Sequence, residues 1–394
     1  MTGRDVAIVG GATTDFGVRP LTWAELAQEV GAALFGAVPG LRAEDVDSLF
    51  LGAAMPERFA FQSHVAPLAA EQMGLKPTRI LQRTELACAS GQSAIRSAYA
   101  AIATGLSDVA VAVGVEKMNL PSMAEANSAM ACVMDRPWDG PAGATAPPFF
   151  AMVAQRHMLE HGTTPEQLAA VSEKNHRFAN SNPHAQFHAK SFPREKLLGL
   201  PIVAPPLRLG DCSSMTDGAA AVVLVADELV RRYPGPVAWV RGTGQYSDFH
   251  NLANAGSLTD WPGLRYAARE ALRRAKIGLP DLDLAELHDC FTISEIVEYE
   301  ALGLCPRGRG GSWAEDGSSD IGGTLPVNTR GGLLGCGHPL GATGIAQAVE
   351  VYEQFAAKVP TARQVPDPTW ALVHNLSGSA NVHSVMVYER GEAS

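Results

Sequence analysis

Residues 84–114, TELACASGQSAIRSAYAAIATGLSDVAVAVG, read as a turn, a helix and a buried strand. Apolar residues recur at helical spacing from Ile95, Gly105 is a typical helix stop, and the run VAVAVG is typical of a buried strand. Cys88 comes just before the helix, where free backbone N–H groups and the positive end of the helix dipole favour a thiolate. Cys88 is therefore either a nucleophile or a buried structural cysteine.

A glycine-rich turn near the end of the chain also leads into a helix. It is NTRGGLLGCGHPLGATGI, residues 328–345, and it places His338 between Gly337 and Pro339. A cysteine and a histidine in equivalent places in two halves of a chain suggest a nucleophile and its base.

Strands alternate with helices in both halves of the chain, which predicts mixed sheets with helices on both faces. PGLRAEDVDSLFLG, residues 39–52, and IGLPDLDLAELHDCF, residues 277–291, each read as a helix end, an acidic turn and a strand. An internal duplication of one α/β unit explains this repetition. It would place Cys88 and His338 at corresponding helix starts, which a pseudo-twofold axis could bring together.

The alternation fails between Met118 and about Pro205, where Pro, Asn and His are frequent. This stretch reads as an insertion of helices and loops, and insertions at strand ends usually build binding sites. Residues 219–227, AAAVVLVAD, then return to the sheet of the first half.

The composition is that of a compact globular protein, with 394 residues and a net charge of −10. This charge, without a Lys/Arg-rich run, argues against a nucleic-acid partner. The six cysteines lack framework spacing and read as reduced, cytoplasmic thiols. We find no signal peptide, no apolar run of about 20 residues that would span a membrane, and no peroxisomal ending of the Ser-Lys-Leu type.

His288 and Cys290, in the sequence HDCF, end a predicted strand and can face one pocket, or they can be a strand-capping histidine and a core cysteine. Together with Cys336 and His338 they also offer two Cys and two His to zinc, although the one-residue spacings are tighter than usual. A zinc-protease pattern, HxxEH, occurs at His157–His161. Gly162 follows it at once, which favours a pair of histidines at a helix C-terminus.

The sequences CASG at the first turn, HDCF, and GGLLGCGHPLGATG at the last turn resemble the motifs of thiolases, in particular the sterol-carrier-protein type and archaeal type. The resemblance spans nearly the whole chain and implies an α/β fold of duplicated units. Two mixed sheets would form a layered α/β/α/β/α sandwich with an inserted loop domain. The implied parts are an N-terminal half (1–117 and 206–235), a loop domain over the CoA site (118–205) and a C-terminal half (236–394).

The resemblance also implies Claisen chemistry on CoA thioesters, as in fatty acid β-oxidation. Cys88 would carry the acyl group, His338 would take its proton, Cys290 would move the Cα proton and His288 would help to bind a thioester oxygen. The backbone N–H groups of Cys88 and Gly378 would bind the other oxygen. CoA enters as substrate or product, with no permanent cofactor and no metal, and the chain would be a homodimer or tetramer.

One departure from the family affects this assignment. Many thiolases carry the acid/base cysteine in a C-terminal Cys-x-Gly, whereas this chain has Leu376-Ser377-Gly378. In the sterol-carrier-type branch the cysteine of HDCF is thought to replace it, which assigns the role to Cys290. Two other functions stay open. One is a retro-aldolase of steroid side chains that works with a small OB-fold partner, although such aldolases lack the cysteine and histidine pattern of Cys88 and His338. The other is a non-enzymatic scaffold.

Overall fold

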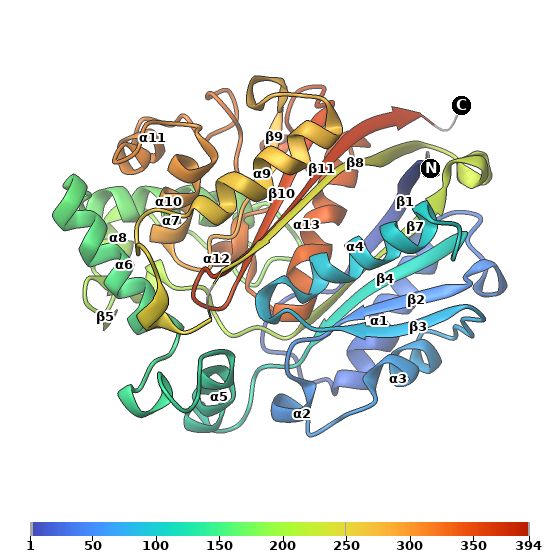
Figure 1. Cartoon of the computed structure of the whole chain (residues 1–394), viewed down its shortest axis with the longest axis horizontal. Coiled ribbons are helices and arrows are strands. Elements are labelled where there is room, and N and C mark those ends of the chain that lie inside the picture. Colours follow the sequence, from blue (N-terminus) through green and yellow to red (C-terminus); the bar gives the residue numbers. More distant parts are fainter. Residues whose placement is uncertain (1–2, 249, 393–394) are drawn as a thin grey trace.

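The computed structural model describes residues 3–248 and 250–392, and nine of its strands form one continuous mixed sheet (Figure 1). The order is β3-β2-β4-β7-β1-β8-β11-β10-β9. The first half provides β1 (Val6–Thr13), β2 (Ser48–Gly52), β3 (Ile80–Thr84), β4 (Val109–Glu116) and β7 (Gly218–Ala226). The second half provides β8 (Pro236–Ser247), β9 (Leu284–Glu286), β10 (Trp370–Ser377) and β11 (Val382–Glu392).

The duplication is confirmed by the pairing of these strands. In the first half β2 is parallel to β4, and β7 is antiparallel to both β4 and β1. In the second half β9 is parallel to β10, and β11 is antiparallel to both β10 and β8. An isolated parallel bridge from Ala285 to Val327 occupies the place that β3 has in the first half.

The two expected sheets are joined along one edge. Strands β1 and β8 pair at Ala7–Trp239 and Ile8–Ala238, so hydrogen bonding continues from one half into the other. The physical reason is that each sheet ends in an equivalent strand with a free edge, and these two edges lie side by side.

Helices form three layers around the strands, which confirms the predicted sandwich (Figure 1). Helices α1 (Trp23–Ala37) and α3 (Val65–Gln72) cover the outer face of the first half, and α9 (Pro262–Ala275) and α10 (Thr292–Leu302) cover that of the second. Helices α4 (Ser90–Ala103) and α13 (Leu340–Phe355) lie between the halves. Strand β4 has a different set of side chains for each layer: its alanines Ala110 and Ala112 face the middle layer, and its valines face the outer one.

Glycines allow the two central helices to approach closely. A Cβ on Gly91 of α4 would lie 2.5 Å from the carbonyl oxygen of Gly341 on α13, and one on Gly114 of β4 would lie 2.0 Å from the same oxygen. No side chain fits at such distances, so the packing requires glycine at these positions. As a result, the starts of α4 and α13 meet at the centre of the molecule.

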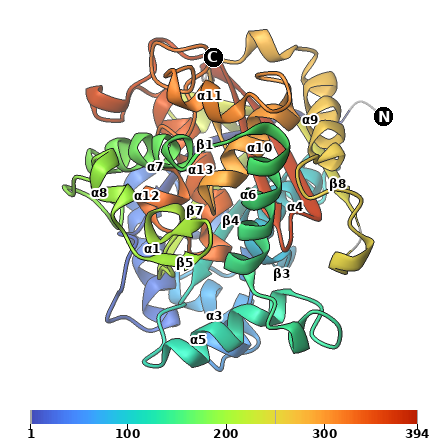
Figure 2. The ribbon, with the colours of Figure 1, turned by 90° about the vertical axis from the view of Figure 1, so that its left-hand side faces the viewer.

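Residues 118–205 form helices toward the left-hand end of the molecule in Figure 1, the side that faces the viewer in Figure 2. They are α5 (Met123–Met130), α6 (Ala146–His161), α7 (Pro165–Asn180) and α8 (Arg194–Leu198), followed by the short hairpin of β5 (Ile202–Ala204) and β6 (Leu207–Arg208). The remaining helices are α2 (Pro56–Phe59), α11 (Gly310–Glu315) and α12 (Gly332–Cys336). Phe150 of α6 stacks on Phe291 at 4.5 Å between ring centroids, which fixes the inserted helix to the second half.

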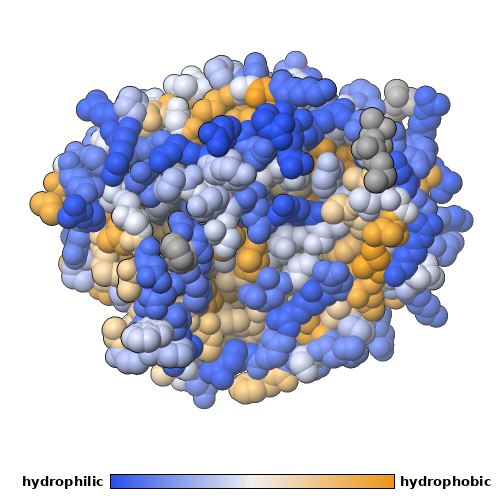
Figure 3. All heavy atoms as spheres, in the orientation of Figure 1, coloured by the Kyte–Doolittle hydropathy of each residue, from blue (hydrophilic) through white to orange (hydrophobic). Residues whose placement is uncertain are grey.

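The face shown in Figure 3 is mostly hydrophilic, with apolar side chains in small groups between the charged ones. Within residues 3–248 and 250–392, no helix combines the length and the apolar character that crossing a bilayer requires.

Candidate active site

Cys88 lies in a tight 3₁₀ turn, Ala87–Ala89, immediately before α4. Ala87 has φ +43°, a left-handed conformation that turns the chain sharply at the cysteine. The Cys88 side chain is partly exposed and opens into a cavity of about 470 Å³. The lining of this cavity is largely apolar and includes Met118, Met130, Pro148, Phe150, Phe291 and Leu340.

Three of the predicted residues converge here. The Cys88 sulfur and one ring nitrogen each from His288 and His338 all lie within 4.8 Å of one another. The two rings meet edge to face, with centroids 5.0 Å apart. This convergence joins a helix start of the first half to a strand end and a helix start of the second.

The tautomer of His338 follows from its neighbours. The Thr343 hydroxyl donates to the carbonyl oxygen of Pro339 at 3.0 Å, so its oxygen accepts from Nδ1–H of His338 at 2.7 Å. The proton is therefore on Nδ1, and Nε2 keeps its lone pair with no hydrogen-bond partner among the described residues. His338 is thus prepared to accept a proton at Nε2.

The expected stabilisation of a Cys88 thiolate is outweighed by burial. Desolvation raises the pKa of Cys88 to about 12, although hydrogen bonds from the backbone N–H groups of Cys88 and Gly378 lower it. Desolvation also lowers the pKa of His338 to about 3. The resting pair is therefore a thiol and a neutral imidazole.

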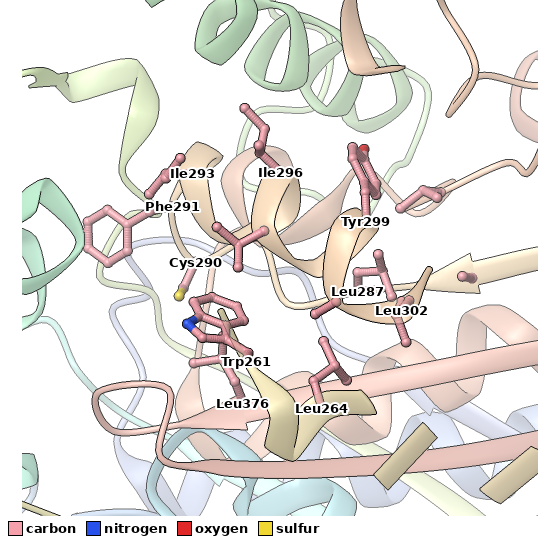
Figure 4. Close-up of a cluster of buried hydrophobic side chains, with 14 of the residues drawn as sticks. Trp261, Leu264, Leu287, Cys290, Phe291, Ile293, Ile296, Tyr299, Leu302 and Leu376 are labelled. Carbon is pink, nitrogen blue, oxygen red and sulfur yellow. The ribbon is translucent and has the colours of Figure 1, made fainter. Parts of the chain in front are cut away.

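His288 and Cys290 lie behind this pair, at the start of α10. Cys290 lines the cavity, and its sulfur lies 3.8 Å from the hydroxyl of Ser294. Burial and the neighbouring Cys88 raise the pKa of Cys290 well above its usual range. Figure 4 shows Cys290 at the border of the cluster of apolar side chains beneath α10. His288 is fully buried, desolvation holds its pKa well below the usual value, and neither ring nitrogen has a partner in the described part of the chain.

Comparison with known proteins agrees with this arrangement. Residues 6–195 match the thiolase N-terminal domain, and residues 244–390 match the thiolase C-terminal domain-like family. The chain is 40% identical to the acetyl-CoA acetyltransferase of Methanothermobacter thermautotrophicus, over 98% of this chain and 100% of that protein. The chain belongs to the thiolase family.

As a thiolase, the chain is an acyltransferase enzyme. Its relatives also include a protein of the predicted sterol-carrier-protein type. The chain is 32% identical to sterol carrier protein 2 of Oryctolagus cuniculus, over 77% of this chain and 57% of that longer protein. Among solved structures, the Ltp2-ChsH2(DUF35) aldolase has a TM-score of 0.83 and 26% identity, over 98% of each chain.

Glu116 is a supporting residue of this thiolase that sequence reasoning missed. It ends β4, and its carboxylate accepts from the backbone N–H groups of Ala54 at 2.8 Å and Gly341 at 3.0 Å. It therefore ties the start of α13 to the first half. Burial raises its pKa to about 7. The only signal was a lone acidic residue at the end of the buried run VAVAVGVE.

Asp289, between the two HDCF site residues, was also missed. Its carboxylate accepts from the backbone N–H groups of Leu333 at 2.7 Å and Leu334 at 3.1 Å, and from the Asn175 amide at 2.7 Å. It thereby fixes the loop that carries His338 to the strand end that carries His288.

Two motifs lie outside the site. The Cys336 sulfur donates to the Arg330 carbonyl oxygen at 2.9 Å within a small separate cluster, so the two-Cys, two-His zinc set does not assemble. In the HxxEH stretch, His157 contacts Thr163 at 2.7 Å through Nδ1 and Glu300 at 3.2 Å through Nε2. Both ring nitrogens are therefore engaged, and the contact with Glu300 anchors α6 to α10.

Proposed function

We propose that the chain makes or cleaves 3-ketoacyl-CoA by Claisen chemistry, as an acyl-CoA:acetyl-CoA C-acyltransferase with an acyl-Cys88 intermediate. The observation that supports this most directly is the convergence of the Cys88 sulfur with the free Nε2 of His338 and with His288. A nucleophile, a base and a neutral hydrogen-bond donor beside one cavity are the groups that acyl transfer needs.

In the first half-reaction the Cys88 sulfur attacks the thioester carbon while its proton moves to Nε2 of His338. The bond from that carbon to the CoA sulfur breaks, and the leaving thiolate takes a proton from Cys290. The products are acyl-Cys88, free CoA, a Cys290 thiolate and a His338 imidazolium, whose opposite charges stabilise each other within one cavity.

In the second half-reaction the Cys290 thiolate removes a Cα proton from a second acyl-CoA. The resulting carbanion attacks the acyl carbon on Cys88, the carbon–sulfur bond breaks, and Cys88 recovers its proton from His338. Thiolytic cleavage, the direction used in fatty acid β-oxidation, is the same sequence in reverse, with CoA as the nucleophile.

Charge develops on a thioester oxygen in both steps and needs preorganised donors. We assign one oxygen to His288, together with His338 or a water, and the other to the backbone N–H groups of Cys88 and Gly378. The interaction of both N–H groups with the Cys88 sulfur supports the second site. Each such donor is worth roughly 3–4 kcal/mol of the barrier.

We assign the approximately 470 Å³ cavity to the CoA thioester. Residues of α5 and α6 form part of its wall, which supports the assignment of 118–205 as a domain that covers the CoA site. The boundaries 1–117 with 206–235, 118–205 and 236–394 remain predictions.

Intact-mass spectrometry tests the nucleophile. The chain is mixed with acetyl-CoA and longer acyl-CoAs, with Cys88→Ala as the negative control and Cys212→Ala as a matched control outside the reacting group. An added acyl mass that only Cys88→Ala abolishes is expected, and the best-loaded acyl chain narrows the substrate. A chain that no acyl-CoA loads would contradict the mechanism.

A retro-aldolase acting with a small OB-fold partner is the second candidate, and the similarity to the Ltp2-ChsH2(DUF35) aldolase favours it. The Cys88 and His338 pair counts against it, because retro-aldol cleavage needs no acyl-cysteine. Cleavage of a 3-hydroxyacyl-CoA side chain without loading of Cys88 would identify the aldolase.

We also propose that the protein is a cytoplasmic homodimer that pairs through β3, either alone or within a tetramer. This strand is an edge of the sheet, and its Leu81 is 41% exposed beside Leu75 and Pro77. All six cysteines are free, which suits a reducing compartment.

A further inference from the structure

We propose that Cys88, His288 and His338 form a binding site for a soft divalent cation of the Zn²⁺ type, which reversibly blocks the thioester cavity. The inference concerns the cavity of the proposed function but does not rest on it, because metal binding requires only the three side chains and no substrate.

The geometry is close to that of a zinc site. A tetrahedral Zn²⁺ lies about 2.3 Å from sulfur and about 2.0 Å from nitrogen, which separates the ligand atoms by roughly 3.5 Å. Here the three candidate ligand atoms already lie within 4.8 Å of one another. Small side-chain rotations about a cation would close the remaining gap.

The donor atoms are also free to coordinate. Nε2 of His338 and both ring nitrogens of His288 are buried and, among the residues that the structure describes, accept or donate no hydrogen bond. Thr343 holds Nδ1–H of His338 at 2.7 Å, the type of outer partner that orients a metal-binding imidazole. Cysteine binds Zn²⁺ as the thiolate, so a cation at this site would displace the proton of the Cys88 thiol.

The fourth coordination position would face the cavity, because Cys88 and His338 both line it. Three protein ligands with one open position are the pattern of an accessible zinc site, not of a closed structural one. A cation there would occupy the nucleophile and compete with any thioester for the same space.

Residues outside the proposed site serve as controls for metal binding. Cys132 is an exposed thiol outside the cluster, and a surface zinc site would depend on it. His157 of the HxxEH stretch has both nitrogens engaged by Thr163 and Glu300, so it offers no free donor.

Isothermal titration of the full chain with Zn²⁺, without any substrate, tests the inference. We expect one Zn²⁺ per chain with release of about one proton, measured by repeating the titration in buffers of different ionisation enthalpy. Cys88→Ala and His338→Ala should abolish this binding, Thr343→Val should weaken it about tenfold, and Cys132→Ser should leave it unchanged. Circular dichroism and thermal unfolding of each variant check that it is folded.

Co²⁺ provides a second readout, since a thiolate ligand gives a sulfur-to-cobalt charge-transfer band. The band is expected in the parent and in Cys132→Ser and should be absent in Cys88→Ala. Zinc binding that survives Cys88→Ala, or cobalt binding without the band, would overturn the inference. If acyl-CoA fails to load Cys88 but Zn²⁺ binds as described, only the proposed function fails; if Cys88 loads but Zn²⁺ does not bind, only this inference fails.

Discussion

At the scale of single residues, the site depends on groups that fix the protonation and position of the reacting ones. The Thr343 oxygen accepts a hydrogen bond from Nδ1–H of His338, which leaves Nε2 without a hydrogen-bond partner among the described residues. Glu116 is buried and holds the backbone that follows β2 to the start of α13. Neither residue has a reacting role in the proposed mechanism, but each controls a property that the mechanism requires.

Thr343→Val should therefore slow acyl loading of Cys88 by about 10²-fold, because the imidazole loses the acceptor that fixes its tautomer. Rapid-quench measurement of acyl-enzyme formation gives this rate. Thr343→Ser keeps the hydroxyl and should load at nearly the parent rate; equal slowing in both variants would assign the effect to packing.

The raised pKa of Glu116 predicts that the free energy of unfolding depends on pH. Its pKa is about 7 in the folded chain and about 4.5 when unfolded, so between these values the folded state binds the additional proton. Its stabilising contribution is therefore complete below about pH 4.5 and falls by about 3 kcal/mol as the pH rises through 7.

Glu116→Gln cannot ionise, so its unfolding free energy relative to the parent should rise by about that amount over the same interval. Urea unfolding at several pH values measures the difference. A difference that stays constant with pH would show that Glu116 is ionised throughout.

At the scale of elements, the two central helices decide whether the site exists. Helices α4 and α13 cross where Gly91 meets the Gly341 carbonyl, and this crossing brings the Cys88 turn to the His338 turn. The loop before α13 is held in turn by the carboxylates of Glu116 and Asp289.

Gly91→Ala should separate these helices, because the new Cβ would lie 2.5 Å from a backbone oxygen that has little freedom to move. We expect a loss of about 1–3 kcal/mol in stability and a marked fall in acyl loading. Thermal unfolding and intact mass report the two effects.

Gly36→Ala in α1 is the matched control, since its Cβ meets no atom within 4 Å and alanine favours a helix. It should be as stable as the parent or slightly more stable. A Gly91→Ala variant that behaved in the same way would show that the crossing tolerates a side chain.

At the scale of the whole molecule, the duplicated halves differ at their outer edges. The second half has only an isolated bridge at Val327 where the first half has β3, so β3 presents the longer free edge. This asymmetry is the basis for assigning the subunit interface to the first half.

Leu81→Lys should therefore disrupt the proposed dimer by placing charge in its interface. Light scattering after size exclusion should give twice 41.5 kDa for a dimeric parent, or four times that mass for a tetrameric one, and half of the parent's mass for the variant. Leu106→Lys, at an equally apolar position that is 62% exposed after α4, should leave the mass unchanged. A parent chain that already elutes as a monomer would refute the interface.

The sequence alone determined the elements and the reactive residue types. The alternation of strands and helices predicted mixed sheets with helices on both faces, since burial on one or both faces leaves a direct record in apolar periodicity. The layered sandwich was implied by the resemblance to thiolases. The glycine-rich turns marked Cys88 and His338, because a helix start next to small residues is visible in local sequence. The roles of the four site residues came from motifs of a family and remain to be tested.

Only the tertiary structure decided what these residues can do. Burial by distant segments keeps Cys88 a thiol, against the local effect of the helix start, because desolvation depends on everything packed around the sulfur. The joining of the two sheets through β1 and β8, and the support from Glu116 and Asp289, likewise depend on partners far apart in the chain. Such contacts leave no periodic trace, so the sequence named the candidate site residues, while packing set their protonation and brought them together.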